Sequence, residues 1–471
     1  MVHRRSAERM LDVFQRNGGV YIKLGQHMNA LVYLLPFEYT DTFEVLQDQC
    51  PPTAMKDIRK LIKDETGLEL DDLFENFEEK PIGVASLAQV HRATLKSNQR
   101  PVAIKLQHPQ LQAHAPIDTA LCTSVIRIIK SVFPDFELSW LADEMAVTLP
   151  QELDFGMEAA NLATVRGNFR GDPVFFVPGV FWSTKRILVE EFVYGVKVDD
   201  LEGLRMHDIE PLDVSEVLSR VFSKMLFWDG FVHCDPHPGN IIIRPRQRNW
   251  YEVPFLRKCL GLNPYNFDLI LLDHGLYRSI PSSLRLDFCH LWTSLIRFDE
   301  SKMKHYAARI FEMPSDTSSP VDKLASDITG DTSTGLASLR SLDEKTTVIN
   351  KLNKRKFLSA ITNIMAVLPR EVLLIIKTND ILRSVDRRLG VTGGPALKNE
   401  VGNATEGDEE RMEVVGKRMV RRFAWMVYYC SVAIRNERMR GAHTLREITE
   451  AWLDSWGILA RILIMEMVTS N

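Results

Sequence analysis

A carboxylate and an amide stand five residues apart in one rigid segment of this 471-residue sequence, at Asp235 and Asn240. Phosphoryl transfer needs both groups: a carboxylate beside the attacking oxygen and an amide oxygen that can hold a metal ion. The segment Phe231–Asn240 reads Phe-Val-His-Cys-Asp-Pro-His-Pro-Gly-Asn, and its prolines and glycine stiffen and turn the backbone. We therefore predict that Asp235 acts as base or positions the nucleophile, and that Asn240 binds a metal ion.

The same segment allows two other interpretations. A stretch rich in Pro and Gly is also typical of a surface turn without chemistry. His233, Asp235 and His237 alternate, and alternating residues on a strand share one face, so they could ligate a metal ion in a hydrolase. The two prolines disfavour a strand here. Zinc or iron bound at one equivalent would support the hydrolase hypothesis.

A second carboxylate follows a predicted strand. Asp268–Gly275 reads Asp-Leu-Ile-Leu-Leu-Asp-His-Gly, in which the apolar run ends at Asp273 and Gly275 lets the backbone turn. An oxygen ligand at this place can hold Mg²⁺ against the phosphates of a nucleotide. An Asp-x-Gly after a strand is common, so this motif alone has low specificity. We assign Asp273, together with Asn240, as the predicted ligands of Mg²⁺.

A lysine lies in the strand predicted at Pro101–Gln107, within the run Val-Ala-Ile-Lys that ends at Lys105. Its ammonium would meet the α- and β-phosphates of the nucleotide. A half-buried lysine needs an anionic partner. Glu158, on the helix predicted after the strand pair, is the expected partner, and both residues are predicted to be catalytic.

The order of these features is that of protein kinases. A loop between strands, Pro81–His91, comes first, and the strand lysine and the helix glutamate follow it. A hinge-like strand at Arg186–Gly195 follows, then the segment with Asp235 and Asn240, and finally Asp273. Six features in this order are far more specific than any one of them. We predict an α+β, protein-kinase-like bilobal fold with a small β-rich N-lobe and a large helical C-lobe.

The composition excludes several other classes of protein. With 45% apolar and 25% charged residues and a formal net charge of −4, the chain has no overall attraction to nucleic acid. Its six cysteines form no Cys-x-x-Cys pair, which argues against a zinc site or a disulfide framework. No apolar run reaches the roughly 18 residues that would predict a transmembrane helix, and no targeting segment is predicted.

At these residues the sequence resembles the UbiB/aarF family of atypical kinases, also called ADCK. The resemblance covers roughly residues 10–390. Tyr21–Gln26 (Tyr-Ile-Lys-Leu-Gly-Gln) matches the K-x-G-Q motif of the family, Pro81–His91 matches its loop over the phosphates, and Glu152–Asp154 matches its E-x-D motif. The resemblance implies ATP or ADP and Mg²⁺ as cofactors.

The phosphate loop carries alanine and serine where ordinary kinases carry glycine. Ala85 and Ser86, which the resemblance places against the nucleotide, lack easy access to positive φ and add side-chain atoms where N–H groups approach phosphates. We expect an altered nucleotide preference and turnover. The hinge also departs from the family, which often carries Met-Glu at this place: Glu190 would be the gatekeeper beside the adenine pocket, or point to solvent, and Glu191 is expected to contact the nucleotide.

In the family, the K-x-G-Q helices fold over the place where a peptide substrate would lie. Lys23 and Gln26 would then face the carboxylates of Glu152 and Asp154, and removing one partner would leave a buried charge uncompensated. We assign these four residues a regulatory role and expect weak phosphorylation of proteins in trans. Robust phosphorylation of generic protein substrates would contradict this expectation.

Two further motifs, Leu271–Tyr277 and Leu368–Arg383, resemble more narrowly the mitochondrial branch of the family in animals and fungi. The resemblance implies a mitochondrial protein associated with the inner membrane and tied to lipid homeostasis. Residues 411–471 mix basic and aromatic side chains, so they would either pack as a helix on the core or lie on a membrane surface. The expected partners are a nucleotide and a lipid or membrane surface, with no nucleic acid; the oligomeric state is left open.

The sequence leaves two functions from different classes. One is an ATP-dependent atypical kinase or ATPase, which the retention of every predicted phosphate and metal ligand favours. The other is a catalytically weak nucleotide-binding switch or scaffold in a membrane-lipid system, which the alanine-type loop and the occluding N-terminal motif favour. The predicted regions are a helical extension with the K-x-G-Q motif (1–78), an N-lobe (79–195), a C-lobe (196–390), and a polar linker with C-terminal helices (391–471).

Overall fold

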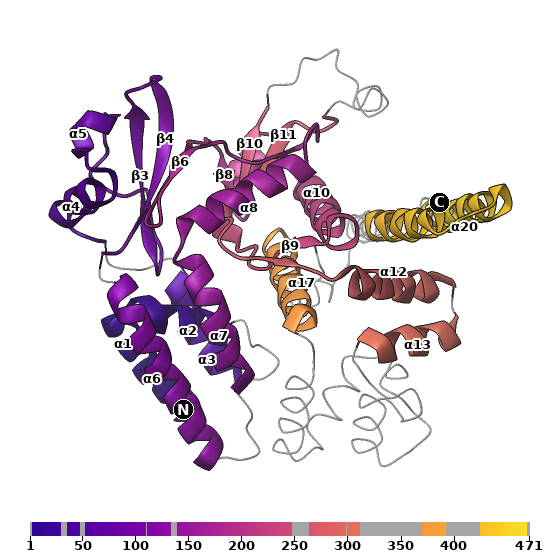
Figure 1. Cartoon of the computed structure of the whole chain (residues 1–471), viewed down its shortest axis with the longest axis horizontal. Helices are drawn as coiled ribbons and strands as arrows, with labels where there is room; N and C mark the ends of the chain where they lie inside the picture. Colours follow the sequence, from indigo (N-terminus) through magenta and orange to yellow (C-terminus); the bar gives the residue numbers. More distant parts are fainter. Residues whose placement is uncertain are drawn as a thin grey trace, which may run out of the picture. The chain divides into compact units, whose positions relative to one another are not determined.

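The computed structural model shown in Figure 1 describes residues 2–29, 35–47, 52–109, 111–132, 139–246, 263–297, 299–310, 370–391 and 424–468. The chain forms two compact units. The first includes Met1–Met157 and Phe181–Glu190, and the second comprises Glu158–Val180, Glu191–Ile310 and Leu374–Asn471. One boundary therefore falls between Glu190 and Glu191, within the segment predicted as a hinge. Two polar segments of the sequence, residues 313–345 and 392–410, lie outside the described residues.

The first unit begins with helices that pack on one another through apolar side chains. Phe14, Ile22, Phe43 and Leu46 form a buried cluster among the first of them. The helix at Met55–Thr66 ends at Gly67, whose φ of 74° closes the helix while its N–H donates to the carbonyl of Lys63. The helices are α1 (Val2–Asn17), α2 (Gly19–Asn29), α3 (Phe37–Phe43), η1 (Glu44–Gln47), α4 (Met55–Thr66), α5 (Leu70–Leu73), α6 (Leu111–Val132) and α7 (Ser139–Glu152).

An antiparallel sheet follows α4 and α5, and it carries Lys105. On β4 the alternate residues Val102, Ile104 and Leu106 are buried against Ile58, Leu61 and Ile62 of α4, so Lys105 lies on the opposite face. Six described strands form this sheet in the order β1-β3-β4-β7-β6, with β2 beside β3. They are β1 (Phe74–Glu75), β2 (Gly83–Val84), β3 (Ala88–Leu95), β4 (Arg100–Gln107), β6 (Val180–Ser183) and β7 (Ile187–Glu191).

The second unit contains two smaller sheets. In the described residues one has the order β5-β11-β10-β8 and the other pairs β12 with β9. The apolar run at residues 174–180 forms two short strands, β5 and β6, because Pro178 and Gly179 interrupt it. The strands are β5 (Phe175–Phe176), β8 (Val196–Lys197), β9 (Phe231–His233), β10 (Ile241–Pro245), β11 (Phe267–Leu271) and β12 (Tyr277–Ser279).

Helices make up most of the rest of the second unit. Residues 424–440 are helical, and Cys430, Ala433 and Ile434 pack with Phe227 and Cys289, so this part of the predicted tail packs on the core. The helices with defined bounds are α8 (Phe155–Asn168, which begins in the first unit), α9 (Leu201–Met206), α10 (Pro211–Ser223), η2 (Lys224–Asp229), η3 (Pro238–Asn240), α12 (Ser282–Arg297), α13 (Glu300–Ile310), α17 (Arg370–Arg388) and α20 (Leu445–Val468).

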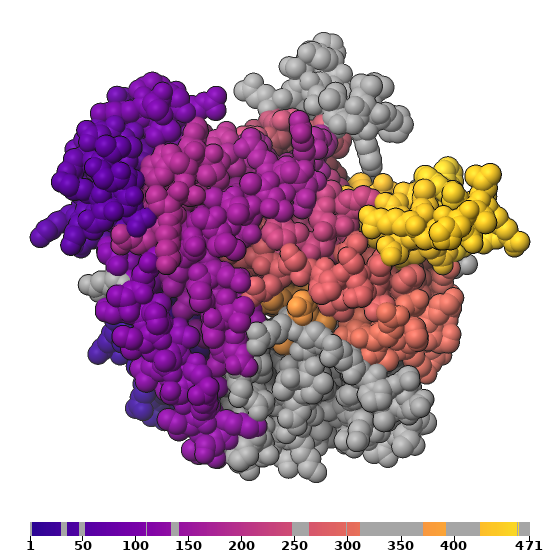
Figure 2. Space-filling model, viewed as in Figure 1, coloured from indigo at the N-terminus to yellow at the C-terminus, as the bar shows by residue number. Residues whose placement is uncertain are grey.

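The last helix, α20, rests partly on α12. Ile458 of α20 is buried with Val427 and contacts Ile296, and Figure 2 shows the yellow atoms of the C-terminal helices beside salmon atoms of the segment that includes α12. Other apolar side chains of α20 are exposed, with Leu453 and Trp456 each 66% accessible. Within the part of the chain that the structure describes, no helix combines the length and apolar character needed to span a membrane.

Candidate functional site

Two antiparallel ladders frame the predicted site in the second unit. The first pairs β9 with β12, and the second pairs β10 with β11. Residues 234–240 connect β9 to β10, and residues 272–276 connect β11 to β12, so these two connections must run side by side. The fold therefore brings Asp235 and Asn240 to the same place as Asp273, although a long interval separates them in the sequence.

Asn240 and Asp273 lie together at the end of the second ladder that is formed by Ile241 and Leu271. The Nδ2 atom of Asn240 lies 3.5 Å from Oδ2 of Asp273. The other carboxylate oxygen, Oδ1, accepts a hydrogen bond from the N–H of Gly275 at 2.8 Å. A Cβ at Gly275 would lie 3.2 Å from that same oxygen, which explains the glycine at this position. One oxygen of Asp273 is thus held by the backbone while the other faces the amide.

This pair of side chains fits the demands of Mg²⁺ on a nucleotide. Mg²⁺ prefers one or two carboxylate or amide oxygens and completes its six ligands with water and phosphate. Oδ2 of Asp273 and the side-chain amide oxygen of Asn240 would hold the ion, and both side chains are only half-buried. Among the described residues, no group of three His, Cys, Asp or Glu side chains is arranged to hold a metal ion.

His233 is a structural link between the two connections. Its Nδ1 accepts from the N–H of Asp235 at 2.9 Å, so its proton is on Nε2, which donates to the carbonyl of Asp273 at 2.9 Å. Burial lowers the pKa of His233 and keeps the ring neutral. His237 also uses Nδ1 to accept a backbone hydrogen bond, from Gly239. Three of the four ring nitrogens of His233 and His237 thus serve the backbone, which disfavours the metal-hydrolase hypothesis.

Helix α8 contacts the Asp-His-Gly turn at two points. The N–H of His274 donates to Oε1 of Glu158 at 3.2 Å, and the carbonyl of His274 accepts from Nδ2 of Asn161 at 2.9 Å. Glu158 and Asn161 are three residues apart and so share one helix face. Glu158 thus positions the residue next to Asp273. Asn161 is not among the residues that the sequence predicts for the site, although a second polar residue one turn after Glu158 was an available signal.

The ring of His274 is fully buried and has two polar partners. Its Nε2 donates to the carbonyl of Leu271 at 3.0 Å, and its Nδ1 accepts from the hydroxyl of Tyr277 at 2.9 Å. The rings of His274 and Tyr277 stack with an interplanar angle of 1°. Burial raises the pKa of Tyr277 well above its ordinary value, so the hydroxyl stays protonated as a donor. The residue between Asp273 and Gly275 is thereby fixed on both sides.

Lys105 lies in the first unit, where its Nζ is 5.3 Å from the centre of the Phe155 ring. That distance is typical of a cation–π contact. Glu158 belongs to the second unit, so the ion pair between Lys105 and Glu158 stays a prediction.

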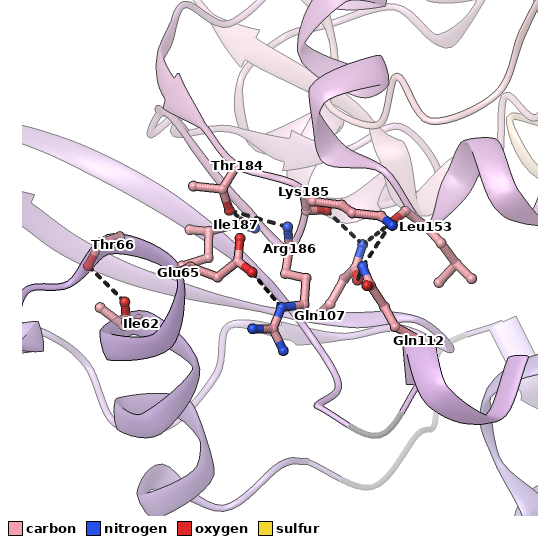
Figure 3. A network of polar contacts seen from close by, with 10 residues as sticks. All are labelled: Ile62, Glu65, Thr66, Gln107, Gln112, Leu153, Thr184, Lys185, Arg186 and Ile187. Carbon is pink, nitrogen blue, oxygen red and sulfur yellow. Dashed lines mark hydrogen bonds and ion pairs between the residues drawn. The ribbon is translucent and has the colours of Figure 1, made fainter.

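Gln107, two residues after Lys105, holds the junction between α7 and α8 against the sheet (Figure 3). Its Nε2 donates to the carbonyls of Leu153 at 2.8 Å and Lys185 at 3.2 Å. The side chain of Gln112 donates in turn to Oε1 of Gln107 at 3.2 Å. Gln107 is not among the residues that the sequence predicts for the site; its signal was a polar residue at a buried position of an apolar strand.

The regulatory residues of the first unit are brought together only in part. Lys23 Nζ lies 2.6 Å from Oε2 of Glu152, and their side chains are 12% and 8% exposed. Gln26, however, donates to the carbonyl of Leu46, and Asp154 accepts from the N–H of Gly156 at the start of α8. The expectation that all four face one another is therefore corrected. Gln26 turns toward η1 because its amide has a backbone carbonyl as partner there, and Asp154 follows the end of α7 and caps α8.

The predicted phosphate loop is closed on itself. The N–H of Ala85 donates to the carbonyl of Ala88 at 2.8 Å, and the carbonyl of Ala85 accepts from Nε2 of His108 at 3.1 Å. The hydroxyl of Thr53 donates to the other nitrogen of His108 at 2.6 Å. Ala85 is exposed, whereas Ser86 is buried. The Ala85 N–H is thus engaged by the protein itself rather than directed at a phosphate.

The two hinge glutamates have different surroundings. The side chain of Glu190 is buried, so it does not point to solvent. The N–H of Glu191 donates to the carbonyl of Gly179 at 2.8 Å, and its carboxylate accepts from the N–H of Gly179 at 3.3 Å. The backbone of Glu191 therefore has a protein partner, and its contact with a nucleotide stays a prediction.

These features agree with what the chain resembles. Residues 45–307 match the ABC1 atypical kinase-like domain. The chain belongs to the ABC1 atypical kinase-like family. The predicted α+β, kinase-like fold and the resemblance to the UbiB/aarF family are thereby confirmed.

Relatives in animals and fungi match most of the chain. The ABC1 family protein MCP2 homolog of Schizosaccharomyces pombe is 42% identical over 83% of this chain and 69% of its own length. AarF domain-containing protein kinase 1 of Mus musculus is 40% identical over 83% and 71%, and ABC1 family protein MCP2 of Saccharomyces cerevisiae is 39% identical over 83% and 69%. A solved structure of Rv3197 with erythromycin, from Mycobacterium tuberculosis, aligns with 81% of this chain and 92% of that one at a TM-score of 0.49 and 18% identity.

Proposed function

We propose that this chain binds ATP with Mg²⁺ and catalyses phosphoryl chemistry, as an atypical kinase or an ATPase. One observation carries the proposal: Asn240 and Asp273 lie 3.5 Å apart, and His233 links the backbones of Asp273 and Asp235. An amide and a carboxylate as oxygen ligands, beside a second carboxylate, form the arrangement that phosphoryl transfer requires. Membership in a kinase-like family supports the same conclusion.

Each residue then has a defined task. Asp273 and Asn240 hold Mg²⁺, which when bound neutralises negative charge on the β- and γ-phosphates. Asp235 orients the attacking hydroxyl or water and accepts its proton. Lys105 binds the α- and β-phosphates, and Glu158 supports the Asp273 turn through the N–H of His274. Because the K-x-G-Q and E-x-D segments are linked through Lys23 and Glu152, we expect little phosphorylation of proteins in trans.

A thermal-shift experiment tests the nucleotide site. A ligand at 100 times its Kd adds about 2.7 kcal/mol to the free energy of unfolding, which raises Tm by a few degrees in a domain of this size. We expect Mg-ATP and Mg-ADP to raise Tm of the purified chain. In the Asp273→Asn variant, the part of this increase that depends on Mg²⁺ should be lost. Release of phosphate from Mg-ATP, lost in Asp235→Asn, would then establish turnover. A folded wild type with no shift at millimolar nucleotide would contradict the proposal.

The alternative is a catalytically weak nucleotide-binding switch or scaffold in a membrane-lipid system. The engagement of the Ala85 N–H by Ala88 and the buried pair of Lys23 with Glu152 favour it. The bond between Ala85 and Ala88 holds the predicted phosphate loop in one conformation. The pair of Lys23 with Glu152 does the same for the N-terminal helices. Stabilisation by Mg-ATP without release of phosphate would favour this function over the enzyme.

The cellular setting is also a proposal. The resemblance to the mitochondrial branch supports association with mitochondrial membranes and lipid homeostasis. The exposed side chains of Leu453 and Trp456 on α20 support contact with a lipid surface. Flotation of the purified chain with anionic liposomes tests this contact. Flotation that stays the same in the double variant Leu453→Ser/Trp456→Ser would exclude α20 as the contact.

A further inference from the structure

Helix α17 is docked on the segment that carries Asp235. Leu374 is buried with Cys234 and Leu276, and the hydroxyl of Thr378 lies 3.5 Å from the carbonyl of His233. Leu374 and Thr378 are four residues apart, so they lie on the same face of the helix. That face contains Lys377 as well, and it contacts three successive residues of the catalytic segment.

Lys377 reaches Asp235 from this helix. Its Nζ lies 3.6 Å from Oδ1 of Asp235, and the two side chains are 17% and 33% exposed. The separation is longer than a normal hydrogen bond, so the ammonium is close to the carboxylate without being bound tightly to it. Three N–H donors on a lysine leave capacity for a second anionic partner.

The position of α17 is fixed at its other end too. The hydroxyl of Ser215 donates to Oδ1 of Asp386 at 2.6 Å, and both residues are buried. Arg388 pairs with Asp199 at 3.0 Å. A helix held at both ends can present one lysine at a defined place, which electrostatic stabilisation of a transition state requires.

The catalytic segment itself supplies no such cation. Phe231–Asn240 contains no lysine or arginine, and both ring nitrogens of its buried histidine, His233, are engaged by the backbones of Asp235 and Asp273. Negative charge on the oxygens of a phosphoryl group in transfer is normally met by a metal ion together with a basic side chain. We propose that Lys377 is a further catalytic residue, whose ammonium binds an oxygen of the γ-phosphoryl group beside Asp235. The inference rests on the function proposed above.

The step balances without any further reactant. The oxygen of a water or hydroxyl forms a bond to the γ-phosphorus, and the bond from that phosphorus to the β–γ bridging oxygen breaks. The electron pair of that bond leaves with ADP, and the proton of the attacking oxygen passes to Asp235. Lys377 stays protonated throughout and stabilises the phosphoryl oxygens by charge and hydrogen bonding.

Steady-state release of phosphate from Mg-ATP by the full chain is the first test. We expect Lys377→Met to lower kcat about 100- to 1,000-fold, as for loss of one stabilising donor, and to change KM for ATP by less than about threefold. Lys377→Arg keeps the charge and should retain kcat within about tenfold of the wild type. Lys377→Gln, which keeps a donor without the charge, should behave like Lys377→Met.

Lys224→Met is the matched control. Lys224 also pairs with an aspartate, at 2.8 Å from Asp229, and its side chain is 16% exposed, close to the value for Lys377. Its loss should lower Tm and leave kcat within about twofold of the wild type. A fall in kcat that followed Tm equally in both variants would overturn a catalytic role for Lys377.

A second measurement needs no turnover. Mg-ADP with aluminium fluoride mimics the phosphoryl group in transfer, so it should raise Tm of the wild type further than Mg-ADP alone. In Lys377→Met the increment from fluoride should disappear while the shift from Mg-ADP remains. If fluoride added an equal increment of Tm in both proteins, or none in the wild type, the role proposed for Lys377 would be overturned. The function proposed above would not be affected by either result. Absence of any shift with Mg-ADP in the wild type would overturn the proposed function and this inference together.

Discussion

His233 donates from Nε2 to the carbonyl oxygen of Asp273 at 2.9 Å, across a separation of 40 residues in the chain. The same ring accepts the N–H of Asp235 at 2.9 Å through Nδ1. One neutral, buried imidazole therefore fixes the distance between the backbone of the predicted base and that of the predicted metal ligand. Such a bridge is sensitive to small changes, since a displacement of about 1 Å in a catalytic group can cost on the order of 100-fold in rate.

His233→Phe should therefore impair both stability and activity. The ring volume is kept, but the N–H of Asp235 and the carbonyl of Asp273 lose their partner, at about 1–3 kcal/mol for each buried group left unsatisfied. We expect a lower midpoint of urea unfolding and a fall in kcat of about 100-fold.

Asn263→Leu is the control for that change. Asn263 is also buried, and its side chain likewise bridges backbone groups, donating to the carbonyl of Phe267 at 2.7 Å and accepting from the N–H of Tyr265 at 2.8 Å. It should lower stability to a similar degree with little change in kcat. If both variants lost the same fraction of activity, His233 would have only a general structural role.

The site residues that the sequence predicts are those that lie close together in the chain. Asp235 and Asn240 share one turn, and Asp273 and Gly275 share another, so the spacing of each pair is fixed by the backbone alone. The run of apolar residues in β11 and the prolines before Asn240 indicate the ladders that bring the two turns together. In a motif of this kind, the local backbone alone sets the relative positions of the functional residues.

The residues that the sequence could not assign act through tertiary contacts. Asn161 binds the carbonyl of His274 from a distance of 113 residues, and Lys377 reaches Asp235 from α17. The local sequence of neither helix identifies the partner, because a single polar residue on one face of an α-helix is common. The direction of Gln26 was missed for the same reason: its partner is a backbone carbonyl, that of Leu46, which has no sequence signature.

Gly25, within the K-x-G-Q motif, should not tolerate a side chain. A Cβ there would lie 2.9 Å from Cδ2 of Phe14 and would also meet Leu46. Gly25→Ala should reduce the free energy of unfolding by about 1–3 kcal/mol through overpacking, as measured by urea titration. Gly167→Ala is the matched control, since a Cβ added at this position of α8 would meet no neighbouring side chain or backbone within 4 Å. This variant should gain up to about 1 kcal/mol in the free energy of unfolding. Two variants of equal stability would contradict this account of the motif.

Lys23 and Glu152 should show strong energetic coupling. Their ion pair is 2.6 Å long and nearly buried, so removing one partner leaves a charge without compensation, at about 3–5 kcal/mol. Lys23→Met and Glu152→Leu should each destabilise the chain, and the double variant should recover about 1–3 kcal/mol relative to the sum. The measurement is a double-mutant cycle by chemical denaturation. Additive effects would show that the two side chains act independently of each other.

The stability of the chain should fall in mild acid through His290. Burial, together with the nearby charges of Arg438, Arg309, Lys302 and Arg297, lowers the pKa of His290 to about 4 from an ordinary value of 6.5. Between those two pH values the unfolded chain binds a proton that the folded chain does not, so the free energy of unfolding decreases as pH falls from 6.5 toward 4. His290→Phe keeps the stacking on Tyr306 and removes the titration. Its Tm should therefore fall less steeply with decreasing pH than that of the wild type, and parallel curves would exclude His290 as a source of the acid sensitivity.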